Sequence, residues 1–110
     1  RESSALKVIQ KLLDFNFKIH IHDPQLSLEF TTQYSFEIES NKIEIFKDKY
    51  EALQNSFGLV VCTEWPEYVD SDIVKIKNNL KSTLFFDGRN LFNPEIMKNL
   101  GLTYFSLGQS

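Results

Sequence analysis

An uninterrupted apolar run, GLVVC at residues 58–62, is followed directly by the polar stretch TEW at residues 63–65. A second apolar run, TLFF at residues 83–86, is followed in the same way by DGRN at residues 87–90. Runs without a polar face are typical of strands in a parallel sheet that is covered on both faces. We therefore predict two strands of such a sheet, with polar residues placed directly after each of them.

Other stretches of the chain alternate between strand and helix patterns. Apolar residues recur at helical spacing near the N-terminus, and Asn93-Pro94 and Gly101 carry the start and stop signals of a later helix. Predicted strands are 17–22, 42–46, 58–62, 83–86 and 102–107, and predicted helices are 3–15, 47–55, 70–80 and 93–101. This alternation predicts an α/β fold: a Rossmann-like three-layer sandwich with a mainly parallel sheet of about five strands and helices on both faces.

Residues 25–41 form the one long stretch that fits neither period. They are polar and contain no glycine. We expect an irregular crossover there, with a short extended or helical piece around residues 28–34.

The length and composition limit the class of protein. A chain of 110 residues is the size of one domain, so we predict a single domain over residues 1–110. The hydrophobic fraction of 42% and the charged fraction of 25% are those of an ordinary globular protein, which excludes a disordered chain. No apolar run approaches the roughly 20 residues that cross a bilayer, so we expect no membrane partner.

The charge balance limits the partners in turn. Twelve basic residues stand against 15 acidic ones, which gives a formal net charge of -3. An extended nucleic-acid or anionic-membrane surface is therefore not expected, and any bound phosphate must be held locally. The single cysteine cannot form an internal disulfide, which fits a reducing, cytoplasmic setting.

Polar residues after the predicted strands are the first candidates for a ligand site, because ligands bind beyond the carboxyl ends of strands in an open parallel sheet. Asp23, Glu64 and Asp87 each follow a strand and are expected on one edge. Gly88 is expected to adopt a positive φ that turns Arg89 out of the sheet. The planar guanidinium of Arg89 then binds a phosphate or a ribose through paired hydrogen bonds.

Each of these candidates also has a simpler interpretation. Arg89 is alternatively a surface arginine paired with Asp87 or Glu64. Glu64 either orients Arg89 or caps the following turn. Trp65 either stacks on a ligand ring or packs a helix onto the sheet, and we favour packing.

Metal and nucleophile sites are not predicted. His20 and His22 share a strand face but lack a third ligand, so we expect no metal. Cys62 ends an apolar run without a neighbouring base, and we expect it to be a small core residue. No glycine-rich phosphate loop occurs, so we expect no conventional dinucleotide site within these residues.

Five stretches resemble one known domain and occur in the same order along it. They are RESSA at 1–5, IHIHDP at 19–24, VVCTEWPEY at 60–68, FFDGRN at 85–90 and GLTYFSLG at 101–108. Together they resemble the C-terminal, UDP-binding domain of the UDP-glucose 6-dehydrogenases, within the UDP-glucose/GDP-mannose dehydrogenase family. The threonine-glutamate-tryptophan and aspartate-glycine-arginine motifs favour the UDP-glucose branch over the GDP-mannose branch.

The resemblance implies an oxidoreductase of nucleotide-sugar metabolism and polysaccharide biosynthesis. Enzymes of that kind oxidise UDP-glucose to UDP-glucuronate in two hydride transfers to NAD, and their C-terminal domain holds the UDP portion. By this resemblance Arg89, together with Asp87 and Glu64, binds UDP-glucose or UDP, and Arg1 reaches NAD. No catalytic residue and no metal ligand are carried over.

The resemblance also implies missing parts. The dinucleotide glycines, the catalytic cysteine motif and a lysine-containing segment of the family are absent, and the chain begins at Arg1 without a methionine. We therefore expect a fragment that is inactive alone, with NAD bound mainly by the absent N-terminal domain. Its expected partners are the remaining domains of the same enzyme, in a homo-oligomer.

Two alternatives stay open. One is a family member that acts on another nucleotide sugar, such as an N-acetylhexosamine, because sugar specificity lies largely in the absent regions. The other is a Rossmann-like interaction module that has lost its ligand. Retention of Arg89, Glu64 and Asp87 argues against the module, since folding alone does not need an arginine at the ligand edge.

Overall fold

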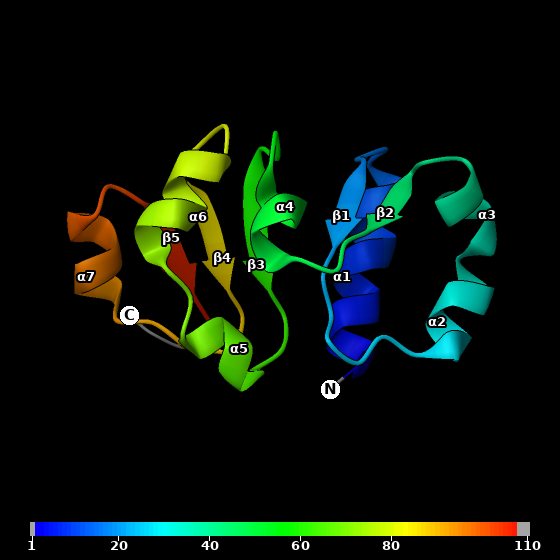
Figure 1. Cartoon of the computed structure of the whole chain (residues 1–110), viewed down its shortest axis with the longest axis horizontal. Coiled ribbons are helices and arrows are strands. Elements are labelled where there is room, and N and C mark those ends of the chain that lie inside the picture. The colour runs from blue at the N-terminus through cyan, green and yellow to red at the C-terminus, as the bar shows by residue number, and fades with distance from the viewer. Residues whose placement is uncertain (1, 108–110) are drawn as a thin grey trace. The chain divides into compact units, whose positions relative to one another are not determined.

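The structure is a computed structural model that describes residues 2–107 (Figure 1). Its elements, in chain order, are α1 (Glu2–Asp14), β1 (Ile19–Ile21), α2 (Leu28–Gln33), α3 (Ser35–Glu39), β2 (Ile43–Ile45), α4 (Lys49–Leu53), β3 (Gly58–Val61), α5 (Pro66–Val69), α6 (Ile73–Asn79), β4 (Leu84–Asp87), α7 (Pro94–Asn99) and β5 (Thr103–Ser106). The chain divides into two compact units, residues 1–52 and 53–110, and each is described by itself.

The first unit is built on two parallel strands, β1 and β2, in which Ile19 lies opposite Ile43. These two isoleucines are buried together with Phe30 and Tyr34. Partly buried apolar residues of α1 and of the connecting segments pack against this cluster, among them Leu6, Ile9, Leu12, Leu13, Leu26 and Ile38. The helical spacing of apolar residues near the N-terminus predicted a helix with one apolar face, and in the structure that face of α1 packs against the core.

Residues 25–41 contain two short helices, α2 and α3, in place of a mostly irregular crossover. The hydroxyl of Ser27 accepts the N–H of Phe30 at 3.1 Å and so caps the start of α2. Phe30 and Tyr34 are four residues apart, and their ring centroids lie 4.9 Å from each other. Two buried rings on one helical turn are too few to produce a clear helical period, which explains why the sequence predicted only a short piece here.

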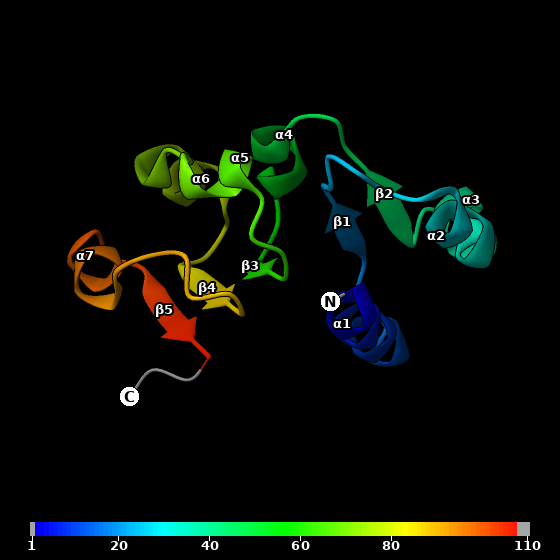
Figure 2. The ribbon, with the colours of Figure 1, turned by 90° about the horizontal axis from the view of Figure 1, so that it is seen from below.

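The second unit is built on three parallel strands in the order β3-β4-β5. Figure 2 shows α6 and α7 on one face of this sheet. The core consists of inward-facing residues of the strands and helices, all with less than 10% of their surface exposed: Val61, Ile76, Leu80, Phe85, Met97, Leu102 and Tyr104. Asp87 at the end of β4 lies among them and is the buried charged residue of the described core, with 1% of its surface exposed.

The strand at 58–62 was expected to be covered on both faces, and within the described residues it is not. Val60 is 40% exposed, and its neighbours in register on β4 and β5, Phe86 and Phe105, are 42% and 51% exposed. The rings of Phe86 and Phe105 stack on each other with centroids 5.1 Å apart. An uninterrupted apolar run thus conceals an alternation, because valine and phenylalanine occupy the outer positions as well.

The predicted fold class is confirmed. The structure is α/β, its strands are parallel and alternate with helices, and all five predicted strands are present, consistent with a Rossmann-like sandwich. The strands are divided between two small sheets, where the sequence predicted one. The short helix α5 was not predicted, although Pro66 at its first position is a helix-start signal. Among the described residues, no helix combines the length and apolar character needed to span a bilayer.

Candidate functional site

Arg89 and Glu64 meet beyond the ends of two paired strands. Val61 ends β3 and Asp87 ends β4, and these two residues lie opposite each other in the parallel register. The loops that follow carry Glu64 and Arg89, whose Oε1 and Nη2 atoms are 2.7 Å apart. The expected placement of these two side chains at one edge of the sheet is therefore seen in the structure.

The Arg89–Glu64 pair is only partly shielded from solvent. The side chain of Arg89 is 32% exposed and that of Glu64 is 50% exposed. An ion pair at such a site is screened by water and contributes at most about 1 kcal/mol to stability. The pair matches both the simpler interpretation of Arg89, a surface arginine paired with Glu64, and the predicted Glu64 that orients the guanidinium.

Most of the hydrogen-bonding capacity of the Arg89 guanidinium is not used by the residues that the structure describes. A guanidinium carries five N–H donors, and Glu64 accepts one of them. The Nε atom is buried and has no hydrogen-bond partner within residues 2–107. The donors that a ligand could reach in this structure are therefore the remaining N–H groups of Nη1 and Nη2.

Asp87 shapes the loop that carries Arg89. Its Oδ1 accepts the N–H of Arg89 at 3.0 Å, and its Oδ2 accepts the N–H groups of Leu91 and Phe92 at 2.8 and 3.2 Å. Residues 88–92 thus fold around a single buried carboxylate. The Asp87 side chain is buried, and it holds Arg89 in position through the hydrogen bond to the Arg89 backbone.

Gly88 does not adopt the positive φ that the sequence predicted, and that prediction is wrong. The left-handed residue of this loop is Asn90, with φ of 57°. Gly88 instead donates its N–H to the Val61 carbonyl at 2.9 Å, and a Cβ on Gly88 would lie 3.0 Å from the same oxygen. Glycine suits this position because a Cβ would crowd the carbonyl oxygen of Val61 at the end of β3.

Tyr104 on β5 was not predicted as part of the site. Its hydroxyl donates a hydrogen bond to Oδ2 of Asp87 at 2.5 Å and lies 3.2 Å from the carbonyl oxygen of Phe92. Burial, and then the hydrogen bond to the negative Asp87, raise the pKa of Tyr104 well above its usual range. The signal in the sequence is a tyrosine at an inward-facing strand position, since a buried phenol needs a partner for its hydroxyl.

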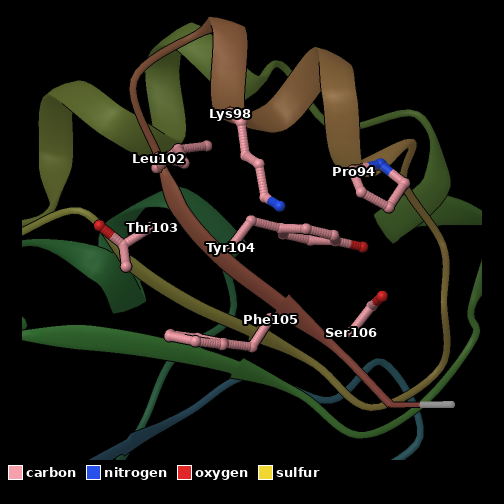
Figure 3. Close-up of a pocket in the computed structure, with 7 residues that line it drawn as sticks. All are labelled: Pro94, Lys98, Leu102, Thr103, Tyr104, Phe105 and Ser106. Atoms are coloured by element: carbon pink, nitrogen blue, oxygen red, sulfur yellow. The ribbon is translucent and has the colours of Figure 1, made fainter. Parts of the chain in front are cut away.

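A shallow groove of about 500 Å³ runs beside Tyr104, between α7 and β5 (Figure 3). Pro94, Lys98 and Ser106 are among the residues that line it. Neither Arg89 nor Glu64 contributes to its lining. The groove and the Arg89–Glu64 pair are therefore separate features of the second unit.

Two other candidate residues, Cys62 and Trp65, lie in the same connection as Glu64, between β3 and α5. Trp65 is half-buried and precedes α5, and its Nε1 is buried without a hydrogen-bond partner among residues 2–107. Burial raises the pKa of the Cys62 thiol above its usual value, which makes it a poor nucleophile. In the first unit, Asp23 accepts the N–H of Gln25 at 2.9 Å. Arg1 lies outside the described residues.

The histidines also have structural contacts. Nδ1 of His20 lies 2.7 Å from the carbonyl oxygen of Ala52, and its ring contacts Phe46 with centroids 4.7 Å apart. Across the described part of the chain, no three His, Cys, Asp or Glu side chains are grouped so that they could hold a metal ion.

Comparison with known proteins identifies relatives along almost the whole chain. The family model described as "UDP-glucose/GDP-mannose dehydrogenase family, UDP binding domain" matches residues 1–94. UDP-glucose 6-dehydrogenase of Pseudomonas aeruginosa is 28% identical over 109 residues, and UDP-glucose 6-dehydrogenase 3 of Oryza sativa is 32% identical over 126 residues. Each match covers 99% of this chain but only 24% and 26% of the respective relative. The chain thus spans about a quarter of the length of the curated relatives that it matches.

Proposed function

Because the chain belongs to the UDP-glucose/GDP-mannose dehydrogenase family, as its UDP binding domain, we propose that it supplies the UDP-holding part of a UDP-glucose 6-dehydrogenase. The proposed reaction of the whole enzyme is the oxidation of UDP-glucose to UDP-glucuronate. Two molecules of NAD accept the two hydrides. The ligand of these residues is UDP-glucose or UDP itself.

The observation that supports this proposal is the partly exposed guanidinium of Arg89 beyond the carboxyl ends of β3 and β4. This edge of a parallel sheet is where ligands bind in folds of this class. The guanidinium is already oriented by Glu64 at 2.7 Å and has donors left for a phosphate. The chain has a net charge of -3, so a local arginine is also the kind of phosphate site that its composition allows.

Three residues have distinct parts in the proposed site. Arg89 binds the UDP-sugar directly, and Glu64 orients its guanidinium. Asp87 holds the loop in place through its hydrogen bond to the Arg89 backbone at 3.0 Å. Arg1 remains the predicted contact for NAD, and the rest of the NAD site belongs to other parts of the enzyme.

We place the enzyme in the cytoplasm, in agreement with a chain that carries a single cysteine. We expect it to act as a homo-oligomer in which the remaining domains of the dehydrogenase complete the catalytic site. The oxidation itself is assigned to those domains and not to Cys62.

Titration of this chain with UDP, followed by NMR of the backbone amides, tests the proposal. We expect weak binding, because half of a site makes few contacts and still loses the full entropy of association. The shifts should cluster at Glu64 and residues 88–92, and Arg89→Ala should weaken binding about tenfold or more.

A matched control comes from the separate groove. Lys98→Ala also removes one positive charge, but from the groove between α7 and β5, and should leave the UDP affinity unchanged. Shifts centred on that groove, or equal losses in the two variants, would contradict the placement of the ligand at Arg89.

A further inference from the structure

A buried tyrosine on β5 contacts the carboxylate that holds the Arg89 loop. Tyr104 has 5% of its surface exposed, and its ring packs against Phe85 with centroids 5.5 Å apart. Its hydroxyl reaches Oδ2 of Asp87 at 2.5 Å, which is the shortest of the four hydrogen bonds that this carboxylate accepts. Figure 3 shows the ring of Tyr104 between β5 and α7.

The carboxylate needs all of these donors because it is charged and 1% exposed. A buried charge is tolerated only where hydrogen bonds replace the water that it has lost. Within residues 2–107, Oδ1 accepts a hydrogen bond from Arg89 alone, whereas Oδ2 accepts from Leu91, Phe92 and Tyr104. The hydroxyl of Tyr104 therefore contributes the one side-chain donor among the four, and it comes from a different strand.

We propose that Tyr104 is a positioning residue for Arg89, because its hydroxyl fixes the Asp87 carboxylate around which residues 88–92 fold. The inference rests on the proposed function of Arg89 as the UDP contact. It adds a residue that lies beyond the 1–94 match and outside the aspartate-glycine-arginine motif. Loss of the hydroxyl leaves Oδ2 with two backbone donors, and the carboxylate then holds the N–H of Arg89 less firmly.

Tyr104→Phe is the informative variant, because it removes the hydroxyl and keeps the ring against Phe85. Hydrogen exchange of the backbone amides measures the loop without any ligand. We expect the amides of Arg89, Leu91 and Phe92 to exchange about tenfold faster in the variant, since one charge-assisted hydrogen bond is lost.

Tyr34→Phe is the matched control for this exchange measurement. Tyr34 is also 5% exposed, and its hydroxyl donates to Oε1 of Gln10 in the first unit at 3.4 Å. The control should leave the three loop amides unchanged. Unchanged exchange of these amides in Tyr104→Phe would overturn the inference.

A double-mutant cycle with UDP separates positioning from a general loss of structure. Tyr104→Phe should weaken UDP binding about fivefold in the otherwise unchanged chain and not at all in the Arg89→Ala background. Equal weakening in both backgrounds, or none in either, would refute a role through Arg89. If the unchanged chain fails to bind UDP, the proposed function fails, and amide exchange still decides whether Tyr104 holds the loop.

Discussion

Two aspartates follow parallel strands in this chain, and they differ in what surrounds them. Asp23 comes two residues after β1 and accepts the N–H of Gln25 at 2.9 Å, two positions further along. Asp87 ends β4, is 1% exposed, and accepts four hydrogen bonds that include one from Tyr104 on β5. The first forms a local turn, whereas the second joins a loop to the core.

The difference shows how the loop that carries Arg89 is kept in place. A turn closed by one short-range hydrogen bond can rearrange without affecting the rest of the unit. A loop folded around a buried carboxylate is joined to the core, here through the hydrogen bond from Tyr104 on β5 to Asp87 at the end of β4. The partly exposed side chain of Arg89 therefore starts from a loop that several hydrogen bonds hold, which is the arrangement that a preorganised ligand contact requires.

The largest expected effect is the contrast between the two aspartates themselves. Asp87→Asn should lower the free energy of unfolding by about 3 kcal/mol or more, because an amide places N–H donors against backbone N–H groups in a buried site. Asp23→Asn should cost less than about 0.5 kcal/mol, since asparagine forms the same turn. Urea unfolding of both variants measures the contrast, and similar losses would show that Asp87 has no special structural role.

A smaller effect is expected at Gly88, where the loops after β3 and β4 approach each other. A Cβ at this position would lie 3.0 Å from the Val61 carbonyl, to which Gly88 is also hydrogen-bonded. Gly88→Ala should therefore cost about 2 kcal/mol, as overpacking does elsewhere. Gly58→Ala is the matched control, because its nearest neighbour would be Leu84 Cβ at an ordinary 3.5 Å. A tolerated alanine at Gly88 would show that the approach of the two loops is not fixed.

The pH dependence of stability should reveal the raised pKa of Tyr104, which burial and then the hydrogen bond to Asp87 cause. The fold holds the pKa of Tyr104 well above the ordinary value of about 10, so above that pH the unfolded chain loses a proton that the folded chain keeps. This contribution is complete below pH 10 and is lost as the pH rises toward the raised folded value. Between pH 9 and 11 the unchanged chain should lose about 1 kcal/mol more than Tyr104→Phe does. Parallel curves would contradict a raised pKa of Tyr104 in the folded chain.

The sequence predicted the strands and the longer helices because their signals are local. Uninterrupted apolar runs placed β3 and β4, and apolar periodicity placed other elements, including β1 and α1, within a few residues of where the structure has them. Pairing between strands is a property of the whole chain, so the division into two sheets was not foreseen. The conformation of Gly88 was also predicted wrongly. Its close approach to the Val61 carbonyl depends on the pairing of β3 with β4, which the local sequence does not show.

The candidate site was predicted in part. Glu64 and Arg89 were expected at one edge because parallel strands end together, and the structure brings them to 2.7 Å. Tyr104 was missed because its hydrogen bond to Asp87 depends on the register between β4 and β5. In that register Phe85 lies opposite Tyr104, and Asp87 is two residues further along β4. A tyrosine inside an apolar strand looks like any core residue until that register is known. Whether Arg89 binds UDP stays a prediction.

The smallest stability effect is expected at the Arg89–Glu64 ion pair, which can be compared with an ion pair of the first unit. Lys18 and Glu44 form a comparable exposed pair in the first unit, with Nζ and Oε1 3.8 Å apart. Glu64→Gln and Glu44→Gln should each change the free energy of unfolding by less than about 1 kcal/mol, because both pairs are screened by water.

Only substitutions in the Arg89–Glu64 pair should change the affinity for UDP. In Glu64→Gln the amide oxygen still accepts from Arg89, while the negative charge that opposes a phosphate is gone, so the UDP affinity should rise about twofold. Glu64→Ala removes the acceptor as well and should lower the affinity, because Arg89 is no longer oriented. Calorimetric titration with UDP distinguishes the variants. Equal affinities for the glutamine and alanine variants would mean that Glu64 acts through its charge alone and does not orient Arg89.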